Sequence, residues 1–106
     1  SASDWPYQER EAQMLVAAGL ARAGLRDSAD RVLKRAETSD KTIDPESELV
    51  STEALIRELM KDREGALRLL GTYLTLHPEH RTGFAQSQSW WWRDLKSDPR
   101  FQALVR

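Results

Sequence analysis

The sequence predicts an all-α domain, and three observations support this fold class. Apolar residues recur every three to four positions along most of the 106-residue chain, which is the period of an amphipathic helix. No stretch alternates apolar and polar residues over more than a few positions, as a half-buried strand would. A segment in the first half of the chain matches a segment in the second half, 37 residues later. Together they predict a single domain over residues 1–106, built from two similar helical hairpins.

The first hairpin is expected over residues 7–37. Its first helix, near residues 7–23, carries an apolar stripe that we predict to face the core: Ala12, Leu15, Val16, Gly19, Leu20 and Ala23. Gly24 is typical of the left-handed residue that follows a helix end. The second helix, near residues 27–37, places Ala29, Val32, Leu33 and Ala36 on one face.

The second hairpin is expected over residues 45–77, after a polar connection at residues 38–44. We predict that Asp44 caps the third helix, near residues 45–60, with Pro45 at its first position. Its inward residues are Leu49, Thr52, Ile56, Leu59 and Met60. Asp62 caps the fourth helix, near residues 63–77, whose inward residues are Ala66, Leu69, Leu70, Tyr73 and Leu76. Pro78 ends that helix, and residues 79–88 are expected to form a loop or a weak helical turn.

Residues 89–105 hold three of the four tryptophans and are expected to close the end of the helical stack. Short helices are predicted near residues 90–96 and 99–105, the second of them started by Asp98 and Pro99. Trp91 and Trp92 share a helical face with Leu95, whereas Trp90 points elsewhere. Trp90 therefore either packs on its own loop or anchors a partner.

Arg26–Leu33 aligns with Arg63–Leu70, and under the same 37-residue offset Ala17 meets Ala54. With small residues at the helix crossings and Pro78 at the end of the second unit, the two hairpins resemble tetratricopeptide repeats, whose period is about 34 residues. Lys61 and Arg57 depart from the pattern, which favours glycine and an apolar residue there. The segment Trp92–Leu104 resembles the closing segment of bacterial proteins that carry such repeats.

The resemblance implies that the first helix of each hairpin lines a groove for a peptide or a segment of a partner protein. Carried over by position, the partner-binding residues are Met14, Ala18, Arg22, Ser51, Leu55 and Glu58. Trp90 is added to them because exposed aromatic residues often anchor partners. The subclass that clamps a carboxyl terminus has lysine and asparagine where this chain has Met14 and Ala18. The groove is therefore expected to accept a hydrophobic or basic segment rather than a chain terminus.

Composition narrows the choice of function. The net charge of −1 argues against a nucleic acid as the main partner, since phosphate binding needs a basic face. No apolar run approaches the ~20 residues of a membrane span, so no membrane insertion is expected. The chain has no cysteine, no glycine-rich phosphate loop and no serine with a histidine base placed beside it. We therefore expect no cofactor and no enzymatic activity.

A histidine pair and a set of glutamates can each be interpreted either as a functional site or as ordinary surface residues. His77 and His80 flank Pro78 and Glu79 and suggest a metal site, but zinc needs three or four ligands, so we interpret them as loop residues. The third helix carries Glu46, Glu48, Glu53 and Glu58, which we interpret as a solvated face, with an acidic partner-binding patch as the alternative.

The sequence thus predicts a protein-interaction module, expected to be the C-terminal part of a larger bacterial regulatory or scaffold protein and to be cytoplasmic. The alternative role is a capping domain that packs only against the upstream repeats of its own parent protein, with no external ligand.

Overall fold

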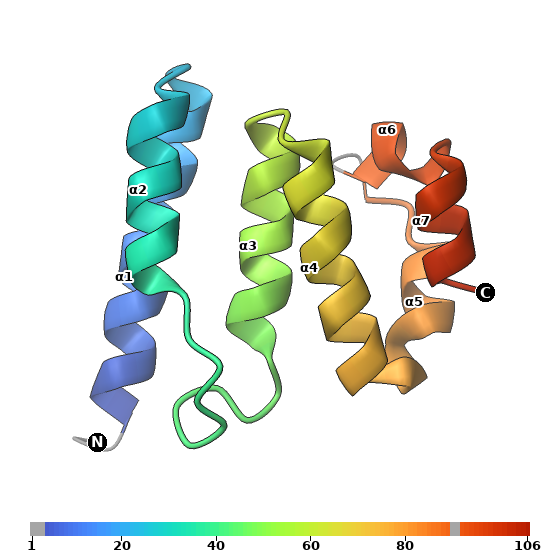
Figure 1. The fold of residues 1–106 in the computed structure, drawn as a ribbon, viewed down its shortest axis with the longest axis horizontal. Helices are drawn as coiled ribbons and strands as arrows, with labels where there is room; N and C mark the ends of the chain where they lie inside the picture. Colours follow the sequence, from blue (N-terminus) through green and yellow to red (C-terminus); the bar gives the residue numbers. More distant parts are fainter. Residues whose placement is uncertain (1–3, 90–91) are drawn as a thin grey trace.

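The computed structural model describes residues 4–89 and 92–106 of the chain (Figure 1). Within these residues every regular element is a helix, as the sequence predicts. The four long helices are α1 (Trp5–Arg22), α2 (Arg26–Ala36), α3 (Glu48–Leu59) and α4 (Arg63–Leu76). They are followed by a 3-10 turn, η2 (Pro78–His80), and by three short helices, α5 (Arg81–Gln86), α6 (Arg93–Lys96) and α7 (Pro99–Leu104).

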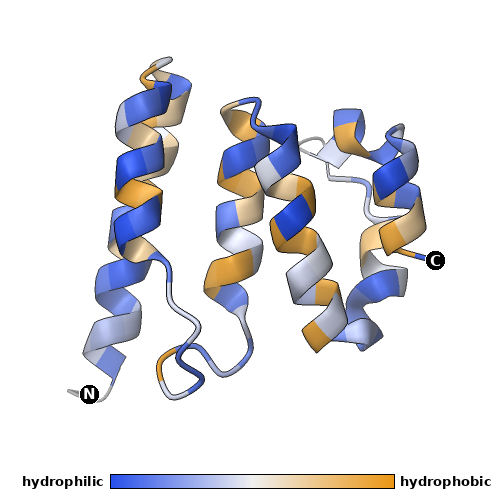
Figure 2. Ribbon diagram, viewed as in Figure 1, coloured by the Kyte–Doolittle hydropathy of each residue, from blue (hydrophilic) through white to orange (hydrophobic). Residues whose placement is uncertain are grey.

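The long helices form two hairpins that lie next to each other. α1 packs against α2, α3 packs against α4, and α1 also contacts α3. The short helices lie beyond α4, with α7 against it, so the chain proceeds along the longest axis from the first hairpin to the C-terminal segment (Figure 1). Figure 2 shows the hydrophobic residues concentrated on α3 and α4, in the middle of this row, whereas α2 is mostly hydrophilic.

The two hairpin turns have the same hydrogen bonding, 37 residues apart. After α1, Gly24 N donates to Ala21 O and Leu25 N to Leu20 O, at 3.1 and 2.9 Å. After α3, Lys61 N donates to Glu58 O and Asp62 N to Arg57 O, at 3.0 and 2.8 Å. Both turns are Schellman motifs with a left-handed residue, Gly24 at φ 80° and Lys61 at φ 64°. The left-handed geometry predicted at Gly24 is confirmed, and Lys61 adopts it without being glycine.

The predicted caps of α4 and α7 are confirmed. Asp62 Oδ1 accepts a hydrogen bond from Gly65 N at 3.0 Å, and Asp98 Oδ1 accepts one from Arg100 N at 2.9 Å. Each carboxylate thus satisfies an amide that has no partner inside the first helical turn.

The predicted start of the third helix at Pro45 is wrong, because α3 begins at Glu48. Ser47, directly before it, is left-handed at φ 55°. Asp44 nevertheless caps the helix from a distance, since its two carboxylate oxygens accept hydrogen bonds from Glu48 N and Leu49 N, each at 2.9 Å. An aspartate that reaches across three intervening residues cannot be distinguished by sequence from one at the usual cap position.

Buried side chains form two apolar clusters. The N-terminal core joins the first hairpin to α3 and consists of Met14, Ala17, Ala21, Ala29, Leu33, Ala36, Leu49, Ile56 and Met60. The C-terminal core joins α3 and α4 to the last segment and consists of Ala54, Leu67, Leu69, Leu70, Trp92, Leu95 and Phe101. Trp92 and Leu95, predicted to share a helical face, both lie in this core, although α6 begins only at Arg93. Trp90 and Trp91 lie outside the described residues.

The predicted inward stripe of the first helix is wrong. Leu15 and Val16 are 70% and 58% exposed, and the side that packs carries Met14, Ala17 and Ala21. α1 is apolar on two opposite sides. The apolar period shows which residues lie on the same side of the helix, but it does not show which of the two sides packs against the core. Residues 79–88, predicted as a loop or a weak helical turn, contain the end of η2 and the short helix α5.

Candidate functional site

A pocket of about 530 Å³ lies where the first hairpin meets the second. It is lined by Met14 of α1, by Glu37, Thr38 and Ser39 just after α2, by Leu49, Val50 and Glu53 of α3, and by Leu69 of α4. Glu37 and Ser39 are exposed and form the mouth, whereas Met14, Leu49, Glu53 and Leu69 are buried and form the floor. Four separate stretches of the chain therefore build one pocket.

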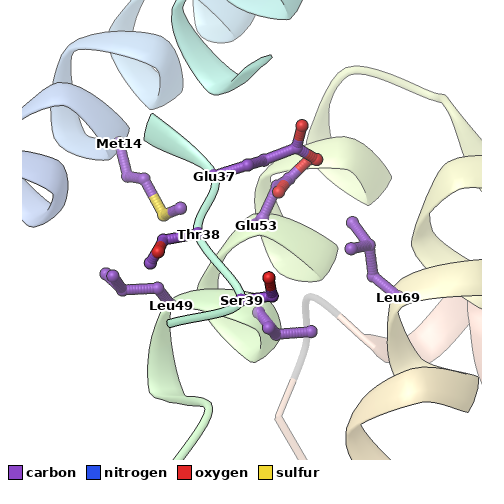
Figure 3. Close-up of a pocket in the computed structure, with 8 residues that line it drawn as sticks. Met14, Glu37, Thr38, Ser39, Leu49, Glu53 and Leu69 are labelled. Carbon is purple, nitrogen blue, oxygen red and sulfur yellow. The ribbon is translucent and has the colours of Figure 1, made fainter. Parts of the chain in front are cut away.

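The walls of the pocket are mainly apolar. Figure 3 shows Leu69 on one side and Met14 and Leu49 on the other, with Glu37 and Glu53 between them. Met14 is only 1% exposed, so it offers one face of its side chain to the pocket and the remainder to the N-terminal core. An apolar side chain or the methylene chain of a lysine or arginine can pack against such walls.

Two carboxyl groups meet inside the pocket. The side chains of Glu37 and Glu53 point toward each other (Figure 3) and share a hydrogen bond. Burial raises the pKa of Glu53 to about 7, the hydrogen bond and negative charge of Glu37 act in the same direction, and Arg57 opposes them. Glu53 can therefore hold a proton near neutral pH and, once ionised, can accept a hydrogen-bond donor or a cation in place of that proton.

Arg57 holds Glu53 in position from behind. Its Nε donates to Glu53 Oε2 at 2.8 Å, and its Nη1 contacts Asp30 Oδ1 of α2 and Asp62 Oδ2, both at 2.9 Å. Burial alone would lower the pKa of Arg57, but these hydrogen bonds raise it above its usual range. This buried guanidinium connects α2, α3 and the cap of α4, which fixes the rear wall of the pocket.

A second hollow, of about 470 Å³, lies between the N-terminal turns of α1 and the connection before α3. Most of its polar lining residues are acidic: Asp4, Glu11, Asp44, Glu46 and Glu48. Tyr7 spans it, with its hydroxyl donating to Glu48 Oε2 at 3.0 Å. Both hollows at the junction of the hairpins thus carry carboxyl groups, and residues 37–46 contribute to both.

The partner-binding residues predicted on α1 have different environments. Met14 is buried, Ala18 is half-buried against the N-terminal core, and Arg22 is exposed. Met14 alone among them lines the pocket.

The partner-binding residues predicted on α3 are half-buried. Ser51 Oγ donates to Glu48 O at 3.0 Å, Leu55 packs against the C-terminal core, and Glu58 accepts a hydrogen bond from Arg63 Nη2 at 2.9 Å. Because successive helical residues are ~100° apart, these three lie on the side of α3 opposite Leu49 and Glu53. The structure therefore separates them from the pocket, and the groove they were assigned to stays a prediction. Trp90 lies outside the described residues.

Sequence reasoning did not assign Glu37 or Leu69 to a site, and it placed Glu53 in one only under the alternative of an acidic partner-binding patch. Glu53 was interpreted as part of a solvated acidic face, which is wrong because it is 1% exposed. A signal was available: Glu53 falls on the same helical period as Leu49, Ile56 and Met60, and Arg57 follows it by one turn. Glu37 and Leu69 carry no such local signal.

The histidine pair lies beside Tyr73. The His80 ring stacks on the Tyr73 ring with centroids 5.6 Å apart, and His77 Nδ1 is 3.4 Å from Glu79 Oε1. Within residues 4–89 and 92–106, no group of three or more histidine, aspartate or glutamate side chains is arranged to hold a metal ion.

No helix in the described part of the chain combines the length and the apolar character that a membrane crossing requires. Comparison of the chain with protein-family models, with curated proteins and with solved structures finds no match.

Proposed function

We propose that this domain is a protein-interaction module that binds a partner segment carrying a lysine or arginine next to apolar side chains. The observation that carries the proposal is the pocket that combines the apolar walls of Met14, Leu49 and Leu69 with the carboxyl pair of Glu37 and Glu53. No catalytic role is assigned to the pair.

The chemistry of the pocket favours a cation attached to an apolar stem. A lysine ammonium or an arginine guanidinium placed between Glu37 and Glu53 takes the place of the proton on Glu53 and meets two acceptors. Its methylene groups lie along the apolar walls, where they leave water. A free metal ion fits less well, because the pocket offers only two carboxyl groups, and its other lining side chains are the hydroxyls of Thr38 and Ser39 and apolar groups.

A partner protein, rather than a small molecule, accounts for the surroundings of the pocket. The second acidic hollow shares the connection at residues 37–46, so a segment with more than one basic residue meets carboxylates at both places. A side chain in the pocket would then act as the buried anchor, with weaker polar contacts around it.

We also infer that the two hairpins are repeats of the tetratricopeptide type, closed by the segment that contains Trp92. The identical Schellman turns at Gly24 and Lys61 and the buried pairs Ala17 with Ala54 and Ala29 with Ala66 support this assignment. In such an array, peptide binding between neighbouring units is an expected role.

Selection from a random peptide library on the full chain tests the proposal. We expect the enriched peptides to carry lysine or arginine beside apolar residues. Their affinity should fall at least about tenfold in Glu37→Gln, the loss of one charge-assisted hydrogen bond. Affinity should also rise between pH 6 and pH 8, because Glu53, whose pKa is about 7, becomes a carboxylate over this range.

Two further variants complete the experiment. Ser39→Trp places a bulky side chain at the exposed mouth and should block binding without disturbing the core. Glu9→Gln, an exposed carboxyl on α1 that does not line the pocket, is the matched control and should bind as the original chain does. Enriched peptides without a basic residue, or binding that is insensitive to both pocket variants, would exclude the proposed site.

A further inference from the structure

α1 presents an apolar surface on the side turned away from the core. Trp5, Leu15 and Val16 are 64%, 70% and 58% exposed. Ala12, Gly19 and Ala23 are exposed along the same side of the helix. We call these six residues the outer stripe. At ~100° per residue, the outer stripe lies opposite Met14, Ala17 and Ala21, so α1 is apolar on two sides. A helix that is apolar on both sides is normally covered on both.

The repeat relation within the molecule shows what covers such a surface. Moving 37 residues along the chain takes Ala12, Gly19 and Ala23 to positions that are all buried in the second hairpin: Leu49, Ile56 and Met60. Those three belong to the N-terminal core and are covered by the first hairpin, through residues of α1 and α2. The part of α3 that corresponds to Ala12, Gly19 and Ala23 is therefore covered by a preceding helical hairpin.

The opposite end of the row is already closed. The residues of α3 and α4 that face away from the first hairpin, among them Ala54 and Leu70, are covered by Trp92, Leu95 and Phe101. The two ends of the row thus differ: the C-terminal end has a covering segment, and the N-terminal end exposes the outer stripe.

We propose that the outer stripe of α1 is the docking surface for a further helical hairpin of the same design, packed on the N-terminal side of the row. This hairpin would present small and aliphatic residues to α1, as Met14, Ala17, Ala21, Ala29 and Leu33 are presented to α3. Gly19 and the alanines of the stripe allow the two backbones to approach closely.

A hairpin fits this surface better than a second copy of the chain. In a second copy, the equivalent covering side of the first hairpin is already occupied by α3, and that of the second hairpin by the C-terminal segment. Two copies could then pack only through α1 of each. Such an interface would cover the outer stripe with one helix, whereas a hairpin would cover it with two. The proposal does not depend on the peptide pocket, whose Met14 lies on the other side of α1.

An extended chain tests the proposal. Residues 1–47 are joined to residues 11–106, because residue 11 stands at the repeat position of residue 48. The second copy of α1 then follows a hairpin, as α3 does in the original chain. We expect one cooperative melting transition, with a Tm about 4 °C or more above that of the 106-residue chain.

Gly19→Arg provides a matched pair of controls within the extended chain. In the second copy of α1, Gly19 takes the position that buried Ile56 holds, so the arginine should remove the gain in Tm. In the first copy, Gly19 is exposed with no neighbour within 4 Å of an added Cβ, so the same change should leave the Tm nearly unaltered.

Three results would overturn the proposal. The first is an extended chain that melts in two separate transitions or gains no stability. The second is a gain that Gly19→Arg in the second copy does not reduce. The third comes from sedimentation of the 106-residue chain: a dimer that Gly19→Arg dissociates would assign the outer stripe to a second copy.

Discussion

Glu53 carries a deeply buried carboxyl group that ionises near neutral pH. Its folded-state pKa, about 7, lies above the ordinary value of 4.5. Between these two values the unfolded chain releases the proton while the folded chain keeps it, so stability falls as pH rises from about 4.5 to about 7. Asp30 and Asp98, whose pKa values are lowered by their partners, act in the opposite direction but at lower pH.

We therefore predict that Glu53→Gln flattens the stability of the protein between pH 5 and pH 7.5 and makes it more stable at pH 7.5. Glutamine keeps an acceptor for Arg57 and a donor for Glu37, so the local hydrogen bonds persist. Urea unfolding at several pH values measures the effect, with Glu9→Gln as the exposed control. An unchanged pH dependence in Glu53→Gln would show that another group titrates in this range.

Arg57 is the buried charge that three elements share. We predict that Arg57→Ala lowers the free energy of unfolding by about 3–5 kcal/mol, because Glu53 is left buried without its cation and Asp30 and Asp62 lose a donor. The comparison is Arg63→Ala, whose side chain is 36% exposed and pairs with Glu58; it should cost about 1 kcal/mol or less. Equal losses in the two variants, measured by denaturant unfolding, would contradict the special position of Arg57.

The sequence marks Arg57 as a departure from an apolar pattern but does not reveal its partners. Asp30 lies 27 residues earlier, and only the packing of α2 against α3 brings it within 2.9 Å. A sequence can thus show that a charged residue stands at a position where the pattern expects an apolar one. The contacts that stabilise the charge there depend on the fold.

At the scale of elements, the two hairpin turns differ at one decisive position. Gly24 and Lys61 both adopt positive φ, which glycine adopts without strain and an L-residue such as lysine adopts only at an energetic cost. We predict that Lys61→Gly raises the free energy of unfolding by about 0.5–1 kcal/mol, the relief of left-handed strain less the added flexibility of the unfolded chain.

The reverse change supplies the control. Gly24→Ala should lower stability by about 1 kcal/mol, since no neighbour lies within 4 Å of the added Cβ and the backbone strain acts alone. Thermal and denaturant unfolding of both variants compare the turns directly. A destabilised Lys61→Gly would mean that the lysine side chain contributes more than the strain removes.

Elements with a local signal were predicted well, and those without one were not. Gly24, Asp62 and the Asp98–Pro99 pair set the ends of α1, α4 and α7 within a residue or two of the predicted limits. The start of α3 was missed because Asp44 caps it from a distance. The inward side of α1 was missed because both of its sides are apolar, and no local rule says which one packs.

At the scale of the whole molecule, the C-terminal segment closes the second hairpin. Phe101 is 2% exposed in the C-terminal core. We predict that Phe101→Ala lowers the free energy of unfolding by about 3–5 kcal/mol, through lost burial and the cavity left behind. Trp5→Ala is the matched aromatic control and should change stability little, because Trp5 is largely exposed.

Truncation after residue 88 extends this prediction. The shortened chain should lose its cooperative melt and bind a hydrophobic dye, since Leu69 and Leu70 lose the cover of Trp92, Leu95 and Phe101. A truncated chain that melts cooperatively would show that the four long helices close their own core.

The 37-residue match predicts the succession of two hairpins, because equivalent positions must be buried in equivalent ways. It could not predict the pocket, which is built from Met14, residues 37–39, α3 and Leu69. These stretches meet because of the path of the connection between α2 and α3. The sequence of a single repeat does not specify that path.

α3 contributes to both apolar clusters, with Leu49, Ile56 and Met60 in the N-terminal core and Ala54 in the C-terminal core. If the first hairpin opens alone, or the last segment detaches alone, one side of α3 stays covered. The amide hydrogens of α3 should therefore exchange with solvent more slowly than those of α1 and α7, and only in a global opening. The first hairpin and the C-terminal segment can therefore open separately, and α3 is the last helix to be exposed to solvent.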